Sequence, residues 1–137
     1  MIGIDTNVLV RYLAQDDPKQ SALATTLFEQ SLTEEAPGFL SSVVLVETVW
    51  VMEDLYATDR PHVAAIIETL LHTSTVIVAD AEIVWRALLG FRAGRADFAD
   101  FFIHELSAAA GCTAVYTFDK LAARDSGMQL LQRRLSN

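Results

Sequence analysis

The sequence predicts an α/β fold, a three-layer αβα sandwich built on a central parallel sheet of four to five strands. Short apolar runs, several of them rich in β-branched residues, alternate with longer segments whose apolar residues recur at helical spacing. Strands separated by helices favour parallel pairing, with helices on both faces of the sheet. No internal repeat, low-complexity tract or linker interrupts this order, so we expect one domain over residues 1–137.

The elements of the first half follow from apolar spacing and capping residues. We expect strands at 1–4 and 39–41 and helices at 6–14, 16–32, 42–56 and 59–72. Asp17 as N-cap and Pro18 at the first helical position begin the second of these helices. The helix over 42–56, "SVVLVETVWVMEDLY", is apolar on nearly every side and is therefore expected to be largely buried.

The second half repeats the alternation. We expect strands at 75–79, 113–117 and 129–131 and helices at 80–94, 97–110 and 119–127. The run "TVIVA" (75–79) is β-branched, as strands prefer. Asp80 is expected to cap the following helix, which Gly90 or Gly94 ends, and Gly111 is expected to end the next one.

Composition excludes a disordered chain and a membrane span. Hydrophobic residues make up 52% of the 137 residues and charged residues 20%, which is enough for a core. The longest apolar stretch is interrupted by Glu47 and is shorter than the ~20 residues that a membrane span requires. With one cysteine, Cys112, and no basic leader at its start, the chain is expected in a reducing cytoplasm.

The net charge is −8, from 18 acidic and 10 basic residues, which argues against binding nucleic acid by bulk electrostatics. It does not exclude an enzyme that acts on nucleic acid. A site of several carboxylates is strongly negative until a divalent metal fills it, so formal charge overstates what a phosphate backbone meets there.

Two aspartates follow predicted strands. Asp5 comes directly after "IGI", and Asp119 comes two residues after "AVYT". Ligands of parallel α/β sheets bind beyond the carboxyl ends of the strands, so the two carboxylates are candidate site residues. The alternative for either aspartate alone is a helix N-cap.

Glu47 interrupts "VVLVETVWV" on a helix with almost no polar face. A buried, unpaired carboxylate costs several kcal/mol, roughly, or takes up a proton, so we expect a metal or a cation nearby. A salt bridge to an arginine is the alternative.

Asp97 and Asp100 lie three residues apart at the start of the helix over 97–110, ~60° apart on a helical wheel. Asp97 is expected as an N-cap, with Asp100 completing something like a capping box. Asp100 lies inside the first turn, where the helix dipole favours its ionised form.

This set of carboxylates, without a histidine pair or a cysteine cluster at metal-ligand spacing, suits a hard cation such as Mg²⁺ or Mn²⁺ rather than zinc. The three histidines are expected to be solvated or to support the site from outside it. They are His62, His72 and His104.

Four motifs in register carry a family resemblance across essentially the whole chain. They are "IDTNVLVRYL", "SSVVLVETVWVME", "ADFADFFI" and "TFDK". In this order and at these separations, they resemble a PIN-domain ribonuclease of the VapC toxin type. The resemblance implies a PIN-like fold and one or two Mg²⁺ or Mn²⁺ ions held by four acids.

Carried over by position, the acidic quartet falls on Asp5, Glu47, Asp100 and Asp119. Asp97 fits an additional acidic position, where it is either a helix cap or an outer acid that joins a second metal. Thr6 and Thr117 match small polar positions beside the metal, and Asn7 matches a polar position that helps fix the first loop. The chain departs from the pattern at three positions, where bulky or basic residues replace small ones or glycine; they are Phe101, Phe102 and Arg95. Substrate preference is therefore not carried over.

The resemblance implies hydrolysis of RNA that leaves a 5′-phosphate and a 3′-hydroxyl. Metals held by carboxylates activate water and stabilise charge on the phosphoryl oxygens. Basic residues near the acids in sequence are candidate phosphate contacts, or else solvated surface charges or partners for Glu and Asp. They are Arg11, Arg92, Arg95, Lys120 and Arg124.

The resemblance also implies a small VapB-type antitoxin that lays a tail across the toxin and blocks its site. The apolar surfaces of the helices at 17–33 and 42–56 are the expected landing area, although an apolar stripe is more often core. A homodimer and a toxin–antitoxin hetero-oligomer are expected as well.

Three other readings stay open. A receiver-like, Mg²⁺-binding phospho-signalling domain needs paired acids after its first strand, but Thr6 follows Asp5, and its only candidate acceptor is Asp80. A haloacid-dehalogenase-like phosphatase needs Asp-x-Asp, but position 7 is Asn. The third is a PIN fold kept only as a binding scaffold, although all four acids are present.

Overall fold

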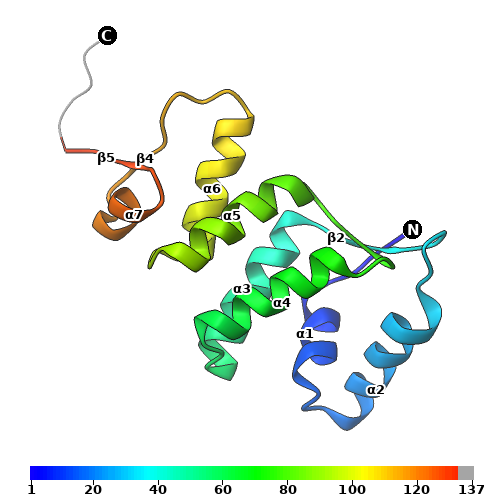
Figure 1. Cartoon of the computed structure of the whole chain (residues 1–137). Helices are drawn as coiled ribbons and strands as arrows, with labels where there is room; N and C mark the ends of the chain where they lie inside the picture. The colour runs from blue at the N-terminus through cyan, green and yellow to red at the C-terminus, as the bar shows by residue number, and fades with distance from the viewer. Residues whose placement is uncertain (133–137) are drawn as a thin grey trace. The chain divides into compact units, whose positions relative to one another are not determined.

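The computed structural model describes residues 1–132, so residues 133–137 of the predicted single domain lie outside the described part. Contacts divide the chain into two compact units, one of Met1–Ala81 and one from Glu82 onward. Each unit combines helices with short parallel strands (Figure 1). The predicted α/β class is thus confirmed.

The first unit contains three strands and most of the helices. Its elements are β1 (Ile2–Gly3), α1 (Thr6–Ala14), α2 (Pro18–Thr26), η1 (Leu27–Ser31), β2 (Gly38–Leu40), α3 (Ser42–Tyr56), α4 (Arg60–His72) and β3 (Val76–Val78). The strands form one parallel sheet in the order β1-β2-β3, with Ile2 opposite Gly38 and Leu40 opposite Val78.

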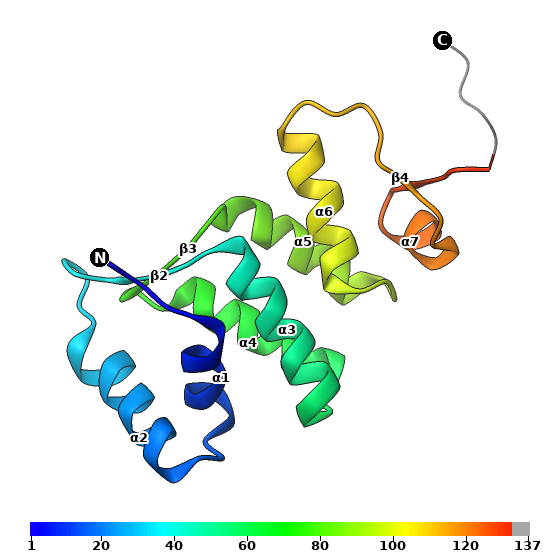
Figure 2. The same cartoon turned by 180° about the vertical axis from the view of Figure 1, so that it is seen from behind.

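The caps that begin these helices are short polar side chains. Asp17 accepts the backbone N–H of Gln20 at 2.8 Å, which confirms the predicted start of α2. Ser41 accepts the N–H of Val44 at 3.2 Å at the start of α3. Helix α1 packs against α2 and α3, and α4 packs against β3 (Figure 2).

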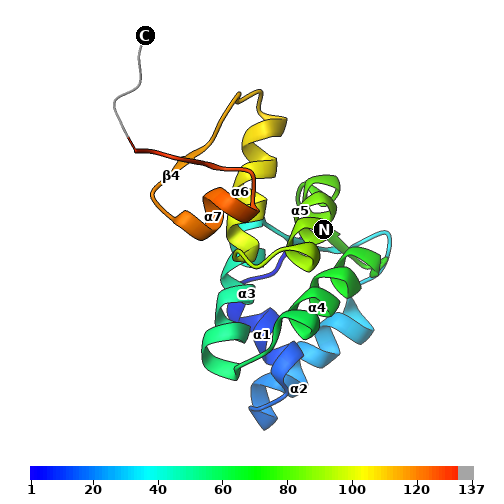
Figure 3. The same ribbon diagram turned by 60° about the vertical axis from the view of Figure 1, so that its left-hand side comes forward.

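The second unit is built around aromatic side chains. Its elements are α5 (Ala81–Ala93), α6 (Phe98–Ala109), β4 (Tyr116–Thr117), α7 (Lys120–Asp125) and β5 (Gln129–Leu130). Phe98 contacts Phe91 edge-on at 5.9 Å between ring centroids and Phe102 at 5.5 Å. Helix α7 packs against β4 and β5, which pair in parallel (Figure 3).

The structure departs from the sequence expectations in three local features. The predicted single sheet appears as a three-stranded and a two-stranded sheet, one in each unit. The helix expected over 16–32 closes with the wider π turn η1, whose Phe28 stacks on Tyr12 at 4.5 Å. Helix α5 runs through Gly90 to Ala93, so Gly94 rather than Gly90 follows its end.

Asp80 was predicted as the N-cap of α5, and this prediction is wrong. Its φ is +53°, in the left-handed region, whereas an N-cap residue takes extended backbone angles. Aspartate tolerates the left-handed region because its short polar side chain can bond locally. None of the helices over residues 1–132 has the length and apolar character needed to cross a membrane.

Candidate functional site

The acids of the first unit meet through a threonine. Asp5 follows β1 and caps α1, accepting the backbone N–H of Thr6 at its Oδ1 at 2.7 Å. The hydroxyl of Thr6 donates to Glu47 Oε1 on α3 at 3.2 Å, across 41 positions of sequence. Thr6 therefore ties the loop that carries Asp5 to the helix that carries Glu47.

Glu47 itself is exposed, which contradicts the expectation of a buried carboxylate. The apolar residues of α3 do not all face the core: Val43 is 67% exposed and Trp50 is 50% exposed. The side of α3 that carries Glu47 is therefore solvated. The Thr6 hydroxyl is its hydrogen-bond partner, and no arginine salt bridge of Glu47 occurs among the described residues.

The acids of the second unit come from the start of α6 and the start of α7. Asp119 caps α7, accepting the N–H of Ala122 at its Oδ1 at 3.0 Å. Thr117 Oγ1 accepts the backbone N–H of Asp119 at 3.0 Å and so fixes the turn between β4 and that aspartate. For both Asp5 and Asp119 the N-cap alternative holds, yet the cap uses one of the two carboxylate oxygens.

The predicted capping box at α6 forms only in part. Asp97 is the N-cap residue by its backbone, but its side chain makes no capping hydrogen bond. The nearby Asp97 backbone lowers the pKa of the Asp100 carboxyl, which is the Asp100 half of the predicted box. Two like charges at one helix end repel, which disfavours both carboxylates turning onto the same backbone groups.

The pKa of the Asp100 carboxyl is raised above its ordinary value in the folded chain. Burial raises the pKa of this carboxyl most, the neighbouring Asp97 carboxylate raises it further, and Asp119 adds to the effect. The Asp97 backbone lowers the pKa, but by less than burial and the two carboxylates raise it. The sequence expectation that the helix end favours the ionised form is therefore outweighed by burial and by negative neighbours.

Neither unit, over residues 1–132, brings three or more His, Cys, Asp or Glu side chains close enough to hold a metal ion. The chemistry of the donors still fits a hard divalent cation, since the acids offer only carboxylate oxygens. The repulsion around Asp100 is also of the kind that a bound cation relieves. That the four acids serve one metal centre stays a prediction.

Arg11, a predicted RNA contact, takes part in an intramolecular network. Its Nε donates to Gln20 Oε1 at 2.8 Å, and its Nη1 lies 3.4 Å from Asp16. The hydroxyl of Tyr56 donates to the same aspartate at 2.6 Å and, with Arg11, lowers the pKa of Asp16. The alternative reading, a partner for acidic residues, therefore describes Arg11 better.

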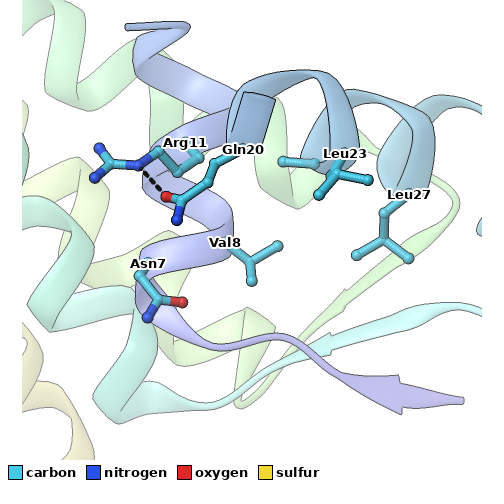
Figure 4. A pocket seen from close by; sticks show the side chains of 7 residues that line it. Asn7, Val8, Arg11, Gln20, Leu23 and Leu27 are labelled. Atoms are coloured by element: carbon cyan, nitrogen blue, oxygen red, sulfur yellow. Dashed lines mark hydrogen bonds between the residues drawn. The ribbon is translucent and has the colours of Figure 1, made fainter. Parts of the chain in front are cut away.

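Asn7 and Arg11 also line a pocket of about 350 Å³ between α1 and α2. Val8, Leu23 and Leu27 supply its apolar wall (Figure 4). Leu23 is 67% exposed, so the pocket opens at an apolar surface of α2. Asn7 was expected to fix the first loop, and that role stays a prediction.

The remaining basic candidates lie in the second unit. Arg92 and Lys120 are exposed on α5 and α7. Arg95 and Arg124 line one pocket together with Asp125, an acid that the sequence reasoning did not single out. The sequence shows only that Asp125 follows Ala122 by three positions on α7. This spacing does not reveal the contact of Asp125 with residue 95.

Parallel α/β units with carboxylates after their strands define a class of protein suited to hard divalent cations. The PIN domain family model matches residues 2–124, and the chain therefore belongs to the PIN-domain family. PIN domains are in general metal-dependent nucleases, so the fold is that of a nuclease. A search of curated proteins finds no match to the chain.

Proposed function

We propose that the chain is a metal-dependent endoribonuclease that hydrolyses RNA phosphodiester bonds with Mg²⁺ or Mn²⁺. The observation that carries the proposal is the family match over residues 2–124, which includes every acid of the quartet. Membership in a nuclease family and an all-carboxylate donor set together favour this reaction over phospho-signalling at Asp80, which requires a different family.

In this proposal Asp5, Glu47, Asp100 and Asp119 hold the metal, and Asp97 adds negative charge beside Asp100. A divalent ion bound by carboxylates supplies an activated water and stabilises charge on the phosphoryl oxygens. The two threonines have supporting roles: Thr6 orients Glu47 through its hydroxyl, and Thr117 holds the backbone of Asp119.

We further propose that the enzyme is the toxin of a toxin–antitoxin pair and works in a reducing cytoplasm. A VapB-type antitoxin would need an apolar landing area, and the 350 Å³ pocket between α1 and α2 offers one. On α3, Trp50 is 50% exposed and Leu55 is 77% exposed, which suits a second contact with the antitoxin or with another toxin chain. The proposed assemblies are a homodimer and a toxin–antitoxin hetero-oligomer.

The test is to incubate the purified, antitoxin-free chain with total RNA and Mg²⁺ or Mn²⁺. We expect endonucleolytic products with 5′-phosphate and 3′-hydroxyl ends. Cleavage should be abolished by a chelator, by Asp5→Asn and by Asp100→Asn. Glu34→Gln, an exposed acid in the loop before β2, is the matched control and should cleave as the parent does. Cleavage in chelator, or full activity of both aspartate variants, would rule out the mechanism; an inert parent would favour a binding scaffold.

A further inference from the structure

The turn that joins β4 to α7 (Figure 3) carries two exposed aromatic side chains. Phe118, in the turn, is 79% exposed, and Tyr116, in β4, is 46% exposed. Neither ring contacts another aromatic ring among the described residues, whereas the phenylalanines of α5 and α6 pack on one another. Packing within the second unit therefore does not explain why the two rings are there.

The backbone that carries these rings is held on both sides. Strand β4 pairs with β5, with Tyr116 opposite Gln129. Thr117 Oγ1 accepts the N–H of Asp119 at 3.0 Å, across Phe118, and Asp119 caps α7. Thr117 is half-buried between the two exposed rings, which is the order expected of extended backbone whose alternate side chains share one face. The turn thus holds both rings on the solvent side of β4.

Phe118 directly precedes Asp119, one of the four proposed metal ligands. Consecutive Cα atoms are about 3.8 Å apart, so an RNA whose phosphate reaches an ion at Asp119 brings its neighbouring bases within reach of this ring. Unpaired bases stack on aromatic side chains, and every base has a face that can do so. Stacking also needs no positive surface, which suits a chain whose net charge is −8.

A protein partner is the other candidate for the exposed rings, and the neighbouring charges disfavour it. Asp119 and Lys120 follow Phe118 directly, and both are exposed. A partner that covered the rings would remove both charges from water, which costs free energy unless each is paired in the interface. RNA avoids this cost, because a metal at Asp119 meets the phosphate while the ring meets a base.

We propose that Phe118, assisted by Tyr116, stacks on unpaired bases beside the phosphate at the metal, so that the site selects single-stranded RNA. The bases of a duplex are already stacked on one another and offer no free face to the ring. The inference rests on the proposed ribonuclease function and adds substrate-positioning residues to it.

The test measures RNA binding in an Asp100→Asn background with Mg²⁺, in which the probe stays intact. Fluorescence anisotropy of a labelled, unstructured RNA oligonucleotide, followed as KCl is raised, gives both the affinity and its salt dependence. Adding Phe118→Ala should weaken binding about fivefold or more, the loss expected for one stacked base. The slope of log K against log salt should not change, because no phosphate contact is lost.

Two further substitutions at position 118 separate stacking from apolar contact. Phe118→Trp keeps an aromatic face and should retain RNA binding, whereas Phe118→Leu keeps only apolar surface and should weaken it. Leu89→Ala is the matched control, because Leu89 is 65% exposed on α5, and it should leave the affinity unchanged. The background should also bind the single strand more tightly than its duplex, and Phe118→Ala should reduce that preference.

The outcomes separate this inference from the proposed function. RNA binding by Phe118→Ala equal to that of Leu89→Ala would overturn the stacking, and cleavage by the parent would still support the nuclease. Weakened binding by Phe118→Ala, with no cleavage by the parent, would support the stacking and overturn the nuclease. Unchanged RNA binding, with a homodimer that dissociates in Phe118→Ala by light scattering, would assign the rings to a protein contact and overturn the RNA assignment. If Phe118→Ala does not fold by circular dichroism, Phe118→Leu against Phe118→Trp decides.

Discussion

The protonation state of the Asp100 carboxyl affects the stability of the folded chain. Its pKa is raised in the folded chain, by burial first and then by Asp97 and Asp119, so the folded state holds this proton more tightly than the unfolded state. Its contribution to stability is therefore complete below the unfolded pKa and is lost as pH rises through the folded pKa. We predict that Asp100→Asn, measured in chelator, raises the thermal midpoint at pH 7 and flattens the pH dependence across that window. A lower midpoint at pH 7 would contradict it.

Thr48 is a second residue that is expected to lower the free energy of unfolding. It lies on α3 next to Glu47, is 1% exposed, and its hydroxyl has no hydrogen-bond partner among the described residues. An unsatisfied buried hydroxyl costs about 1–3 kcal/mol. We predict that Thr48→Val raises the free energy of unfolding by about 1 kcal/mol in urea titrations, whereas Thr48→Ser, which keeps the hydroxyl and loses the methyl group, lowers it. Equal effects of the two variants would contradict this account.

At the scale of elements, the crossing of α5 and α6 explains one departure from the family pattern. Phe101 is bulky where small residues are common, and Gly90 makes room for it. Replacing a glycine inside a helix with alanine normally raises the free energy of unfolding by about 1 kcal/mol. We predict instead that Gly90→Ala lowers the free energy of unfolding by about 1–3 kcal/mol, because the added Cβ would clash with the Phe101 ring. Adding Phe101→Leu should recover most of that loss in a double-mutant cycle, and additive losses would show that the ring is not the obstacle.

Helix and strand positions were predictable because local signals set them. Pro18 after Asp17 defined the start of α2, and the β-branched run before Ala79 defined β3. The failures are positions where a tertiary contact overrides the local pattern. Glu47 was expected to be buried because apolar residues surround it in the sequence. The sequence does not reveal which side of a helix the fold leaves exposed to solvent.

The same contrast between local signals and tertiary contacts applies to the candidate site. Asp5 and Asp119 could be selected because each follows a strand, and both do cap the next helix. The Thr6 to Glu47 hydrogen bond and the contact of Asp125 with residue 95 span 41 and 30 positions. No local periodicity encodes such pairs, so only the folded chain reveals them.

For the whole molecule, the acids are shared between two units of the chain: Asp5 and Glu47 precede residue 82, and Asp100 and Asp119 follow it. The family match runs through both units, over residues 2–124. If one metal centre uses all four acids, the metal links the stability of the two units, because a ligand that binds only the native state stabilises everything needed to form its site.

Metal binding by the quartet can be measured independently of activity. We predict that Mg²⁺ or Mn²⁺ raises the thermal midpoint of the parent and of Glu34→Gln, with a gain of about 2.7 kcal/mol when the metal is about a hundredfold above its Kd. Asp5→Asn and Asp100→Asn should each remove the shift, measured against each variant's own midpoint in chelator. A shift that survives in Asp5→Asn but not in Asp100→Asn would assign the metal to the acids after residue 82 alone. The quartet would then not act as one centre, because losing a true ligand from either unit leaves a bound divalent ion short of the oxygen donors it requires.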